Sequence, residues 1–273
     1  MITEKEIAGI LDGDGRSNDT LDVSVFEPHT SLHPKIWVGD HLKEDIRNKL
    51  YRTALEFYLF LNVQAPIKDI TVTGSLANYN YTQNSDIDLH ILIDYHEVDE
   101  NIELVEELLS SKKTVWNDRH NITIFGHEVE LYAQNLNEPH HSTGIYSIIK
   151  NEWATKPKPT SAQIDFAAVR AKSQDLMRQI DRVTEDAGNE SAIDALKSKI
   201  KKMRQCGLET AGEYSVENLT FKVLRNTGHI GKLYMAARRM FDDRLSLKEA
   251  HESRLRTLVC WYVNSGVNTG NGL

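Results

Sequence analysis

The chain has little cysteine and no long apolar run. Only two of its 273 residues are cysteine, Cys206 and Cys260. Two thiols are too few for a disulfide scaffold, so a reducing compartment with free thiols is expected. No apolar stretch approaches the roughly 18 residues that a membrane-spanning helix needs, and the N-terminus has no basic region leading into an apolar run. These absences predict a cytoplasmic protein without a membrane partner, and they leave the oligomeric state open.

Acidic and basic residues are unevenly divided along the chain, whose net charge is -8. Residues 1–155 hold 12 Lys and Arg against 26 Asp and Glu, whereas residues 156–273 hold 20 against 14. An asymmetry of this size predicts two modules. The acidic module is suited to holding metal ions. The basic module is suited to a polyanion or to docking on the acidic one, and a solvated helix surface is the plainer alternative.

Hydrophobic periodicity predicts an α+β first part and a helical second part. Apolar residues at three- and four-residue steps predict helices over 42–61 and 101–113. Alternating apolar residues predict short strands over 69–73, 86–93, about 120–125 and 127–134. The helical pattern in the second part of the chain predicts several helices, two of them near 216–242 and 246–263.

Proline marks the boundary between the two parts. Residues 155–160 read TKPKPT, and two prolines in a basic polar run interrupt both the helical and the strand period. The segment therefore predicts a linker. We expect an N-terminal arm over 1–40, an α+β domain over 41–155 and a helical domain over 160–273.

One segment combines a Gly-Ser turn with a pair of aspartates. A strand runs into Gly74-Ser75, and ten further residues precede Asp86-Ile87-Asp88. Glycine lets the backbone approach a ligand closely, and exposed N–H groups with the Ser75 hydroxyl are suited to phosphate oxygens. Asp86 and Asp88 lie two residues apart on a strand, so both point to the same face. The segment predicts a phosphate site beside two carboxylates.

The paired aspartates predict a metal site. Two like charges about 7 Å apart along a strand repel unless cations bridge them, and oxygen-only ligands favour Mg²⁺ over zinc. Two metals about 3.5–4 Å apart are the usual arrangement for nucleotidyl transfer, and a third carboxylate would complete such a site. The strand within residues 126–132 supplies it. Glu130 lies between two apolar residues and is the better copy of the Asp-Ile-Asp pattern, with Glu128 as the alternative.

The pattern Gly74-Ser75, ten residues, Asp86-Ile87-Asp88-Leu89 resembles the signature of the polymerase-beta-type nucleotidyltransferase superfamily. The resemblance implies a small mixed sheet with flanking helices, often followed by a helical domain. It also implies that Gly74 and Ser75 hold a nucleotide triphosphate, that Asp86 and Asp88 ligate Mg²⁺ or Mn²⁺, and that Glu130 completes the metal site and helps to activate the acceptor. Longer segments, such as WNDRHNITIFGHEVELY, are similar to predicted nucleotidyltransferases of tailed phages, which would act in the host cytoplasm.

These features predict an enzyme, with its catalytic domain over 41–155. It would be a Mg²⁺-dependent nucleotidyltransferase that moves a nucleoside monophosphate from an NTP such as ATP to a hydroxyl and releases pyrophosphate. The charge division favours an RNA 3′ end as acceptor, while a nucleotide, a protein or a small molecule stays open. His140, His141, Ser142 and Tyr146 follow the Glu130 strand, where an acceptor or a base is suited to bind.

Two alternatives accompany this prediction. One is a non-catalytic nucleotide-binding module that acts as a regulator or an antitoxin-like partner. The other is a nucleic-acid-binding phage protein in which the motif is incidental, and its binding would weaken steeply with salt. The base preference and the number of nucleotides added are not readable from the sequence.

Overall fold

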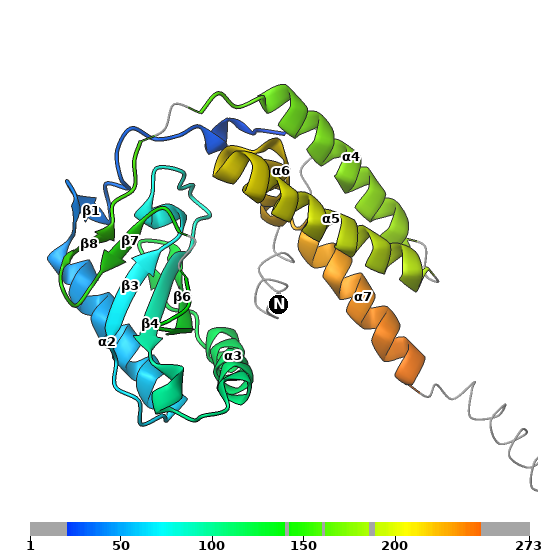
Figure 1. Cartoon of the computed structure of the whole chain (residues 1–273). Helices are drawn as coiled ribbons and strands as arrows, with labels where there is room; N and C mark the ends of the chain where they lie inside the picture. Colours follow the sequence, from blue (N-terminus) through cyan, green and yellow to red (C-terminus); the bar gives the residue numbers. More distant parts are fainter. Residues whose placement is uncertain (1–20, 140–141, 160–161, 186–188, 247–273) are drawn as a thin grey trace, which may run out of the picture.

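A computed structural model describes residues 21–139, 142–159, 162–185 and 189–246. Figure 1 shows two parts side by side, a sheet-containing head and a bundle of helices. We call residues 37–155 the head and residues 166–246 the helical half. The predicted fold class is confirmed, because a mixed sheet with flanking helices is followed along the chain by helices alone.

The head is built on a six-stranded sheet in the order β5-β6-β4-β3-β7-β8. β4 runs antiparallel to β3 and parallel to β6. β1 and β2 form a separate two-stranded antiparallel hairpin that precedes the other strands in the sequence. β7 and β8 were not predicted, because three- and four-residue strands are too short to show an alternating pattern. The strands are β1 (Trp37–Val38), β2 (His41–Leu42), β3 (Asp69–Thr73), β4 (Ile87–Ile93), β5 (Thr123–Ile124), β6 (His127–Asn135), β7 (Ile145–Ser147) and β8 (Glu152–Thr155).

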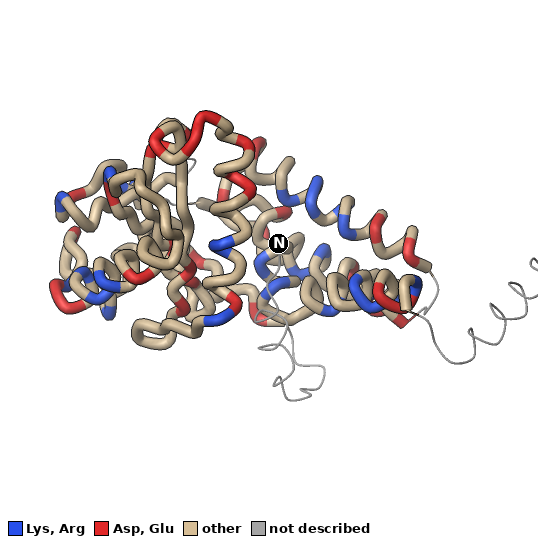
Figure 2. The backbone as a smooth tube through the Cα atoms, turned by 90° about the horizontal axis from the view of Figure 1, so that it is seen from below, with Lys and Arg blue, Asp and Glu red and all other residues tan. Residues whose placement is uncertain are grey.

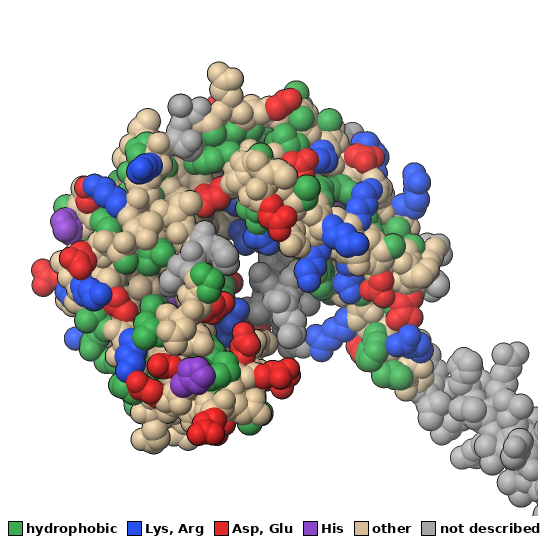
Figure 3. All heavy atoms as spheres, in the orientation of Figure 1, with side chains coloured by type: hydrophobic (Ala, Val, Ile, Leu, Met, Phe, Trp, Pro, Cys, Tyr) green, Lys and Arg blue, Asp and Glu red, His purple; other side chains and the backbone are tan. Residues whose placement is uncertain are grey.

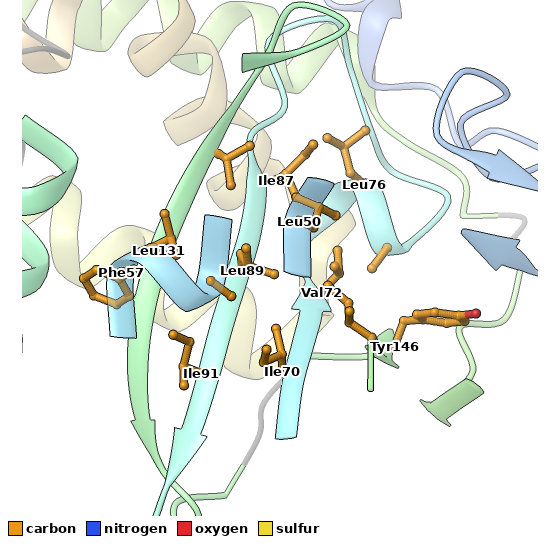
Figure 4. Packing of buried hydrophobic residues seen from close by; sticks show 14 of the residues in the cluster. Leu50, Phe57, Ile70, Val72, Leu76, Ile87, Leu89, Ile91, Leu131 and Tyr146 are labelled. Carbon is orange, nitrogen blue, oxygen red and sulfur yellow. The ribbon is translucent and has the colours of Figure 1, made fainter. Parts of the chain in front are cut away.

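One face of the sheet is apolar and is buried against helix α2 (Glu44–Leu61). The four alternate isoleucine and leucine side chains of β4 are each at most 1% exposed. Figure 4 shows some of them beside Leu50 and Phe57 of α2. Because successive strand residues point to opposite faces, the charged residues of β4 and β6 lie on the other face.

Helix α3 (Ile102–Arg119) closes the open edge of β6 and extends six residues beyond its predicted end at 113. The Asn117 side chain donates a hydrogen bond to the Leu131 carbonyl and accepts one from the Leu131 N–H, each at 3.1 Å. These bonds satisfy a backbone edge that would otherwise be unpaired. They also bring the middle of α3 beside the polar face of the sheet.

The helical half consists of four helices around their own apolar cluster. The helix predicted over 216–242 is two helices, because Gly228 adopts a φ of 78° and begins a new one. The helix predicted over 246–263 lies outside the described residues, as does Cys260, whereas Cys206 is a free, exposed thiol. No helix in the described part of the chain is long and apolar enough to cross a membrane. The four helices are α4 (Phe166–Glu185), α5 (Glu190–Ala211), α6 (Val216–Asn226) and α7 (His229–Leu245).

The N-terminal segment from residue 21 onward connects the two parts; residues 1–20 of the predicted arm lie outside the described residues. Val23 and Phe26 are buried in a cluster with side chains of α4 and α6. A few residues later, the His29 N–H donates a hydrogen bond to the Tyr79 carbonyl at 2.8 Å, and its ring stacks on Tyr81 at 3.8 Å. The segment therefore packs on the helical half at one end and on the head at the other.

A second attachment lies at the loop between Gly-Ser and the aspartates. The Glu213 carboxylate, in the turn between α5 and α6, accepts hydrogen bonds from the side-chain amides of Asn78 and Asn80. It also accepts one from the Thr143 hydroxyl at 3.1 Å. This carboxylate fixes the start of α6 against the same loop that carries Ser75.

Candidate active site

Gly74 lies directly against the carboxylate of Asp88. It directly follows β3 with a φ of 76°, and a Cβ at this position would lie 1.8 Å from Asp88 Oδ2. No side chain fits that space, and other residues rarely adopt this φ. Two features of the structure therefore favour glycine at position 74: the positive φ of the backbone and the adjacent carboxylate of Asp88.

Ser75 is held by a small hydroxyl network across the base of the loop. Its Oγ is hydrogen bonded to Ser85 Oγ at 2.8 Å, and Ser85 Oγ accepts the Thr82 N–H, also at 2.8 Å. The Ser85 carbonyl in turn accepts a bond from Nδ1 of the buried His127 at 2.7 Å. This network ties the residue before Asp86 to the Gly-Ser turn, although nine residues separate Ser75 from Ser85.

The structure brings Asp88 and Glu130 together. They are register partners on the parallel strands β4 and β6, so their side chains are neighbours on the polar face. Asp86 immediately precedes β4 and shares this face by alternation. Glu128 is paired instead with Thr123 of β5, toward the sheet edge. We call Asp86, Asp88 and Glu130 the acidic cluster.

Electrostatics within the acidic cluster disfavour the ionised form of Asp88. Burial raises the pKa of Asp88, the neighbouring carboxylates of Glu130 and Asp86 act in the same direction, and the resulting pKa is about 7. Arg225 and Lys113 oppose this shift. A carboxylate in this environment gains from a bound cation, because a cation removes the repulsion that raises its pKa.

Tyr132 adds a hydrogen bond to the cluster. Its hydroxyl donates to Glu130 Oε2, which orients that carboxylate. Its ring is stacked on His90, with centroids 4.7 Å apart, and carries the Lys113 ammonium 3.9 Å from its centroid. Burial, followed by the charges of Asp88 and Glu130, raises the pKa of Tyr132, so the phenol stays protonated and remains a donor.

Cations from the helical half face the acidic cluster, and the sequence pattern did not identify them as site residues. Burial lowers the pKa of Lys222 on α6 to about 8, while Glu213 and Asp88 act in the opposite direction. Arg225, one turn further along α6, interacts electrostatically with Asp88 and with Lys222. Arg204 of α5 interacts with Lys222. Figure 3 shows a hollow between the two parts, with Lys and Arg on the helical side and Asp and Glu on the head. Figure 2 shows Lys and Arg recurring along the helices of that half.

The donor set of the acidic cluster fits a hard divalent cation. It offers carboxylate oxygens only, which is the chemistry that Mg²⁺ and Mn²⁺ prefer. Among the described residues, no three His, Cys, Asp or Glu side chains are already gathered closely enough to hold a metal ion. The acidic cluster thus offers carboxylate oxygens but does not form a closed cage among the described residues.

The family comparison identifies the domain that carries these residues. Residues 52–152 match the family described as the nucleotidyltransferase domain. The predicted resemblance to nucleotidyltransferases is therefore confirmed for residues 52–152, and it indicates transfer of a nucleoside monophosphate in general. All three members of the acidic cluster and the Gly-Ser pair fall inside the matched range. No curated protein and no solved structure shows significant similarity to the chain.

Proposed function

We propose that the protein is a divalent-metal-dependent nucleotidyltransferase that moves a nucleoside monophosphate from an NTP to a hydroxyl acceptor. The observation that carries this proposal is the contact between Gly74 and the Asp88 carboxylate, with Glu130 in register beside it. A phosphate bound at the Gly-Ser turn would lie next to three carboxylates that need a cation. The family match gives the reaction class.

Each residue of the site has a role in this reaction. The backbone and hydroxyl of Ser75, with Gly74, would contact the triphosphate, and the acidic cluster would hold Mg²⁺, or Mn²⁺ in its place. Bound metal would lower the pKa of the acceptor hydroxyl and neutralise the leaving pyrophosphate. The acceptor oxygen forms a bond to the α-phosphorus as the bond to the bridging oxygen of the β-phosphate breaks, and the hydroxyl proton passes to Glu130.

The cations that face the acidic cluster would bind the phosphates. Lys222 and Arg225 approach Asp88 from α6. Phosphate oxygens are strong acceptors for such groups. The helical half would therefore complete the nucleotide site rather than only support it.

The acceptor is a separate question from the reaction class. The surplus of Lys and Arg after residue 155 favours an RNA 3′ end. Two of these cations, Lys222 and Arg225, interact electrostatically with Asp88 and are suited equally to the triphosphate. Hydroxyls of nucleotides, proteins and small molecules remain candidates, and transfer assays must include each class.

Pyrophosphate release from each of the four NTPs tests the proposal. The assay compares the wild type with the double variant Asp86→Asn plus Asp88→Asn, in Mg²⁺, in Mn²⁺ and in chelator. We expect metal-dependent release in the wild type and a loss of about 1,000-fold or more in the double variant. A fluorescent ATP analogue measures nucleotide binding in parallel.

Asp118→Asn is the matched control, because Asp118 lies on α3 outside the acidic cluster. It should release pyrophosphate at the wild-type rate. Equal release from the wild type and the double variant would refute the proposal. Metal-dependent ATP binding without release, across all acceptor classes, would instead favour the non-catalytic module.

A further inference from the structure

A pocket opens beside Glu130 on the polar face of the sheet, between β4, β6 and α3. We call it the α3 pocket. Its volume is about 380 Å³, at the small end of the range for ligand sites. Thr73, the register partner of Asp88, and Tyr132, whose hydroxyl bonds to Glu130, both line it. A group bound in this pocket would therefore lie next to the acidic cluster.

The lining of the α3 pocket is rich in hydrogen-bond acceptors. Gln134 is 8% exposed, and its buried Oε1 has no hydrogen-bond partner within the described residues. An unsatisfied buried carbonyl of this kind costs free energy unless a ligand or water supplies a donor. The carboxylates of Glu106 and Glu138 also line the pocket. These acceptors match a ligand that carries many O–H or N–H donors.

The charge of the pocket argues against a phosphate. Among the described residues that line it, the only Lys or Arg is Lys113, which lies over the Tyr132 ring, whereas the carboxylates of Glu106 and Glu138 line the pocket from α3 and from the loop after β6. An added phosphate would meet like charges there, which disfavours its binding. Two cations of the helical half, Lys222 and Arg225, instead interact electrostatically with Asp88 in the acidic cluster.

We infer that the α3 pocket binds the acceptor, and that the acceptor is a small hydroxyl- and amine-bearing molecule without phosphate. The inference rests on the proposed function, because it assigns the pocket to the hydroxyl that Glu130 activates. The alternative occupant, the 3′ end of an RNA, would bring phosphates to the carboxylate-lined mouth. Ser142, one of the residues expected near the acceptor, lines the pocket. His140 and His141 lie outside the described residues, and Tyr146 is fully buried in the core.

Saturation-transfer NMR with the full chain tests this assignment, using glucosamine, glucose and glucose 6-phosphate as probes. The protein is held with Mg²⁺ and a non-hydrolysable ATP analogue. We expect signals from glucosamine and glucose and none from glucose 6-phosphate. Absence of signal from all three sugars, or equal signals from the phosphorylated one, would overturn the inference.

Two pairs of neighbouring residues on α3 provide matched variants. Ser110 lines the pocket and Ser111 does not, and both are exposed. Ser110→Trp should fill the pocket and abolish the sugar signals, whereas Ser111→Trp should leave them intact. In the same way Glu106 lines the pocket and Glu107 does not. Glu106→Lys should weaken glucosamine binding about tenfold and admit glucose 6-phosphate, and Glu107→Lys should do neither.

Binding of a fluorescent ATP analogue distinguishes failure of the pocket assignment from failure of the proposed function. If every α3 variant binds the analogue with Mg²⁺ but Ser110→Trp and Ser111→Trp give the same sugar signals, the pocket assignment is wrong and the proposed function stands. If the wild type binds no nucleotide, the proposed function itself fails. A short oligoribonucleotide whose 3′ end is labelled in a Ser110-dependent way would replace the small-molecule acceptor with RNA.

Discussion

One face of the central sheet is packed in the core and stabilises the fold, whereas the other face carries the acidic cluster. On β4, Leu89 and Ile91 are fully buried against the α2 side, while Asp88 and His90, which alternate with them, lie on the polar face. The same alternation recurs on β6, where Leu131 is buried and Glu130 is half-buried. Because every second residue belongs to the other face, substitutions one position apart should have different consequences.

Leu89→Ala should have the largest effect on stability. Its side chain is fully buried between β3 and β6 in the core cluster. Removing it leaves a cavity and should lower the free energy of unfolding by about 2–5 kcal/mol. Denaturant unfolding measures this loss, and pyrophosphate release per folded molecule should stay near wild type. Asp88→Asn is the opposite case, with activity lost at nearly unchanged stability; if both variants lost stability alike, the division between faces would be wrong.

Gly74→Ala tests the point where β3 meets the polar face. The new methyl group would lie 1.8 Å from Asp88 Oδ2 and would sit on a residue with a φ of 76°. Either the carboxylate or the Gly-Ser turn must move, and a displacement of about 1 Å at a catalytic group costs on the order of 100-fold in rate. We expect that loss in pyrophosphate release. Gly126→Ala is the control, since its φ is also positive, at 88°, but open space surrounds it.

The pH dependence of stability should report the repulsion on the polar face. The folded-state pKa of Asp88 is raised from 3.8 to about 7. The folded protein therefore holds a proton that the unfolded chain has lost, and stability falls as pH rises between these values. Without divalent metal, the free energy of unfolding should be higher at pH 5.5 than at pH 8. Asp88→Asn should show a smaller difference, and added Mg²⁺ should reduce the difference in the wild type. An identical pH profile in the variant would contradict this account.

Local patterns predicted much of the fold and named candidates for the site. Strict alternation in β4 and β6 identified the two faces, and the Gly-Ser spacing predicted the turn. Glu130 lies beside Asp88 because β4 and β6, which are separated in sequence by α3, pair in parallel. The sequence does not show this pairing, and Glu130 was predicted only because its apolar neighbours resemble those of the Asp-Ile-Asp pattern. The approach of α6 was not predictable. It depends on contacts between distant residues, such as Glu213 with the Asn78–Asn80 loop, that leave no periodic trace.

Lys222→Met should have the smallest effect of these substitutions, because it alters the helical half and not the sheet that carries the acidic cluster. Methionine keeps most of the buried stem and removes the charge that faces Asp88. Loss of one charged contact to a phosphate, present in substrate and transition state alike, should raise the KM for NTP about tenfold with little change in kcat. Steady-state kinetics across NTP concentrations measure this. Lys232→Met is the control, since Lys232 on α7 is paired with Asp181 at 2.6 Å. An unchanged KM in Lys222→Met would mean that the helical half supports the head without contacting the nucleotide.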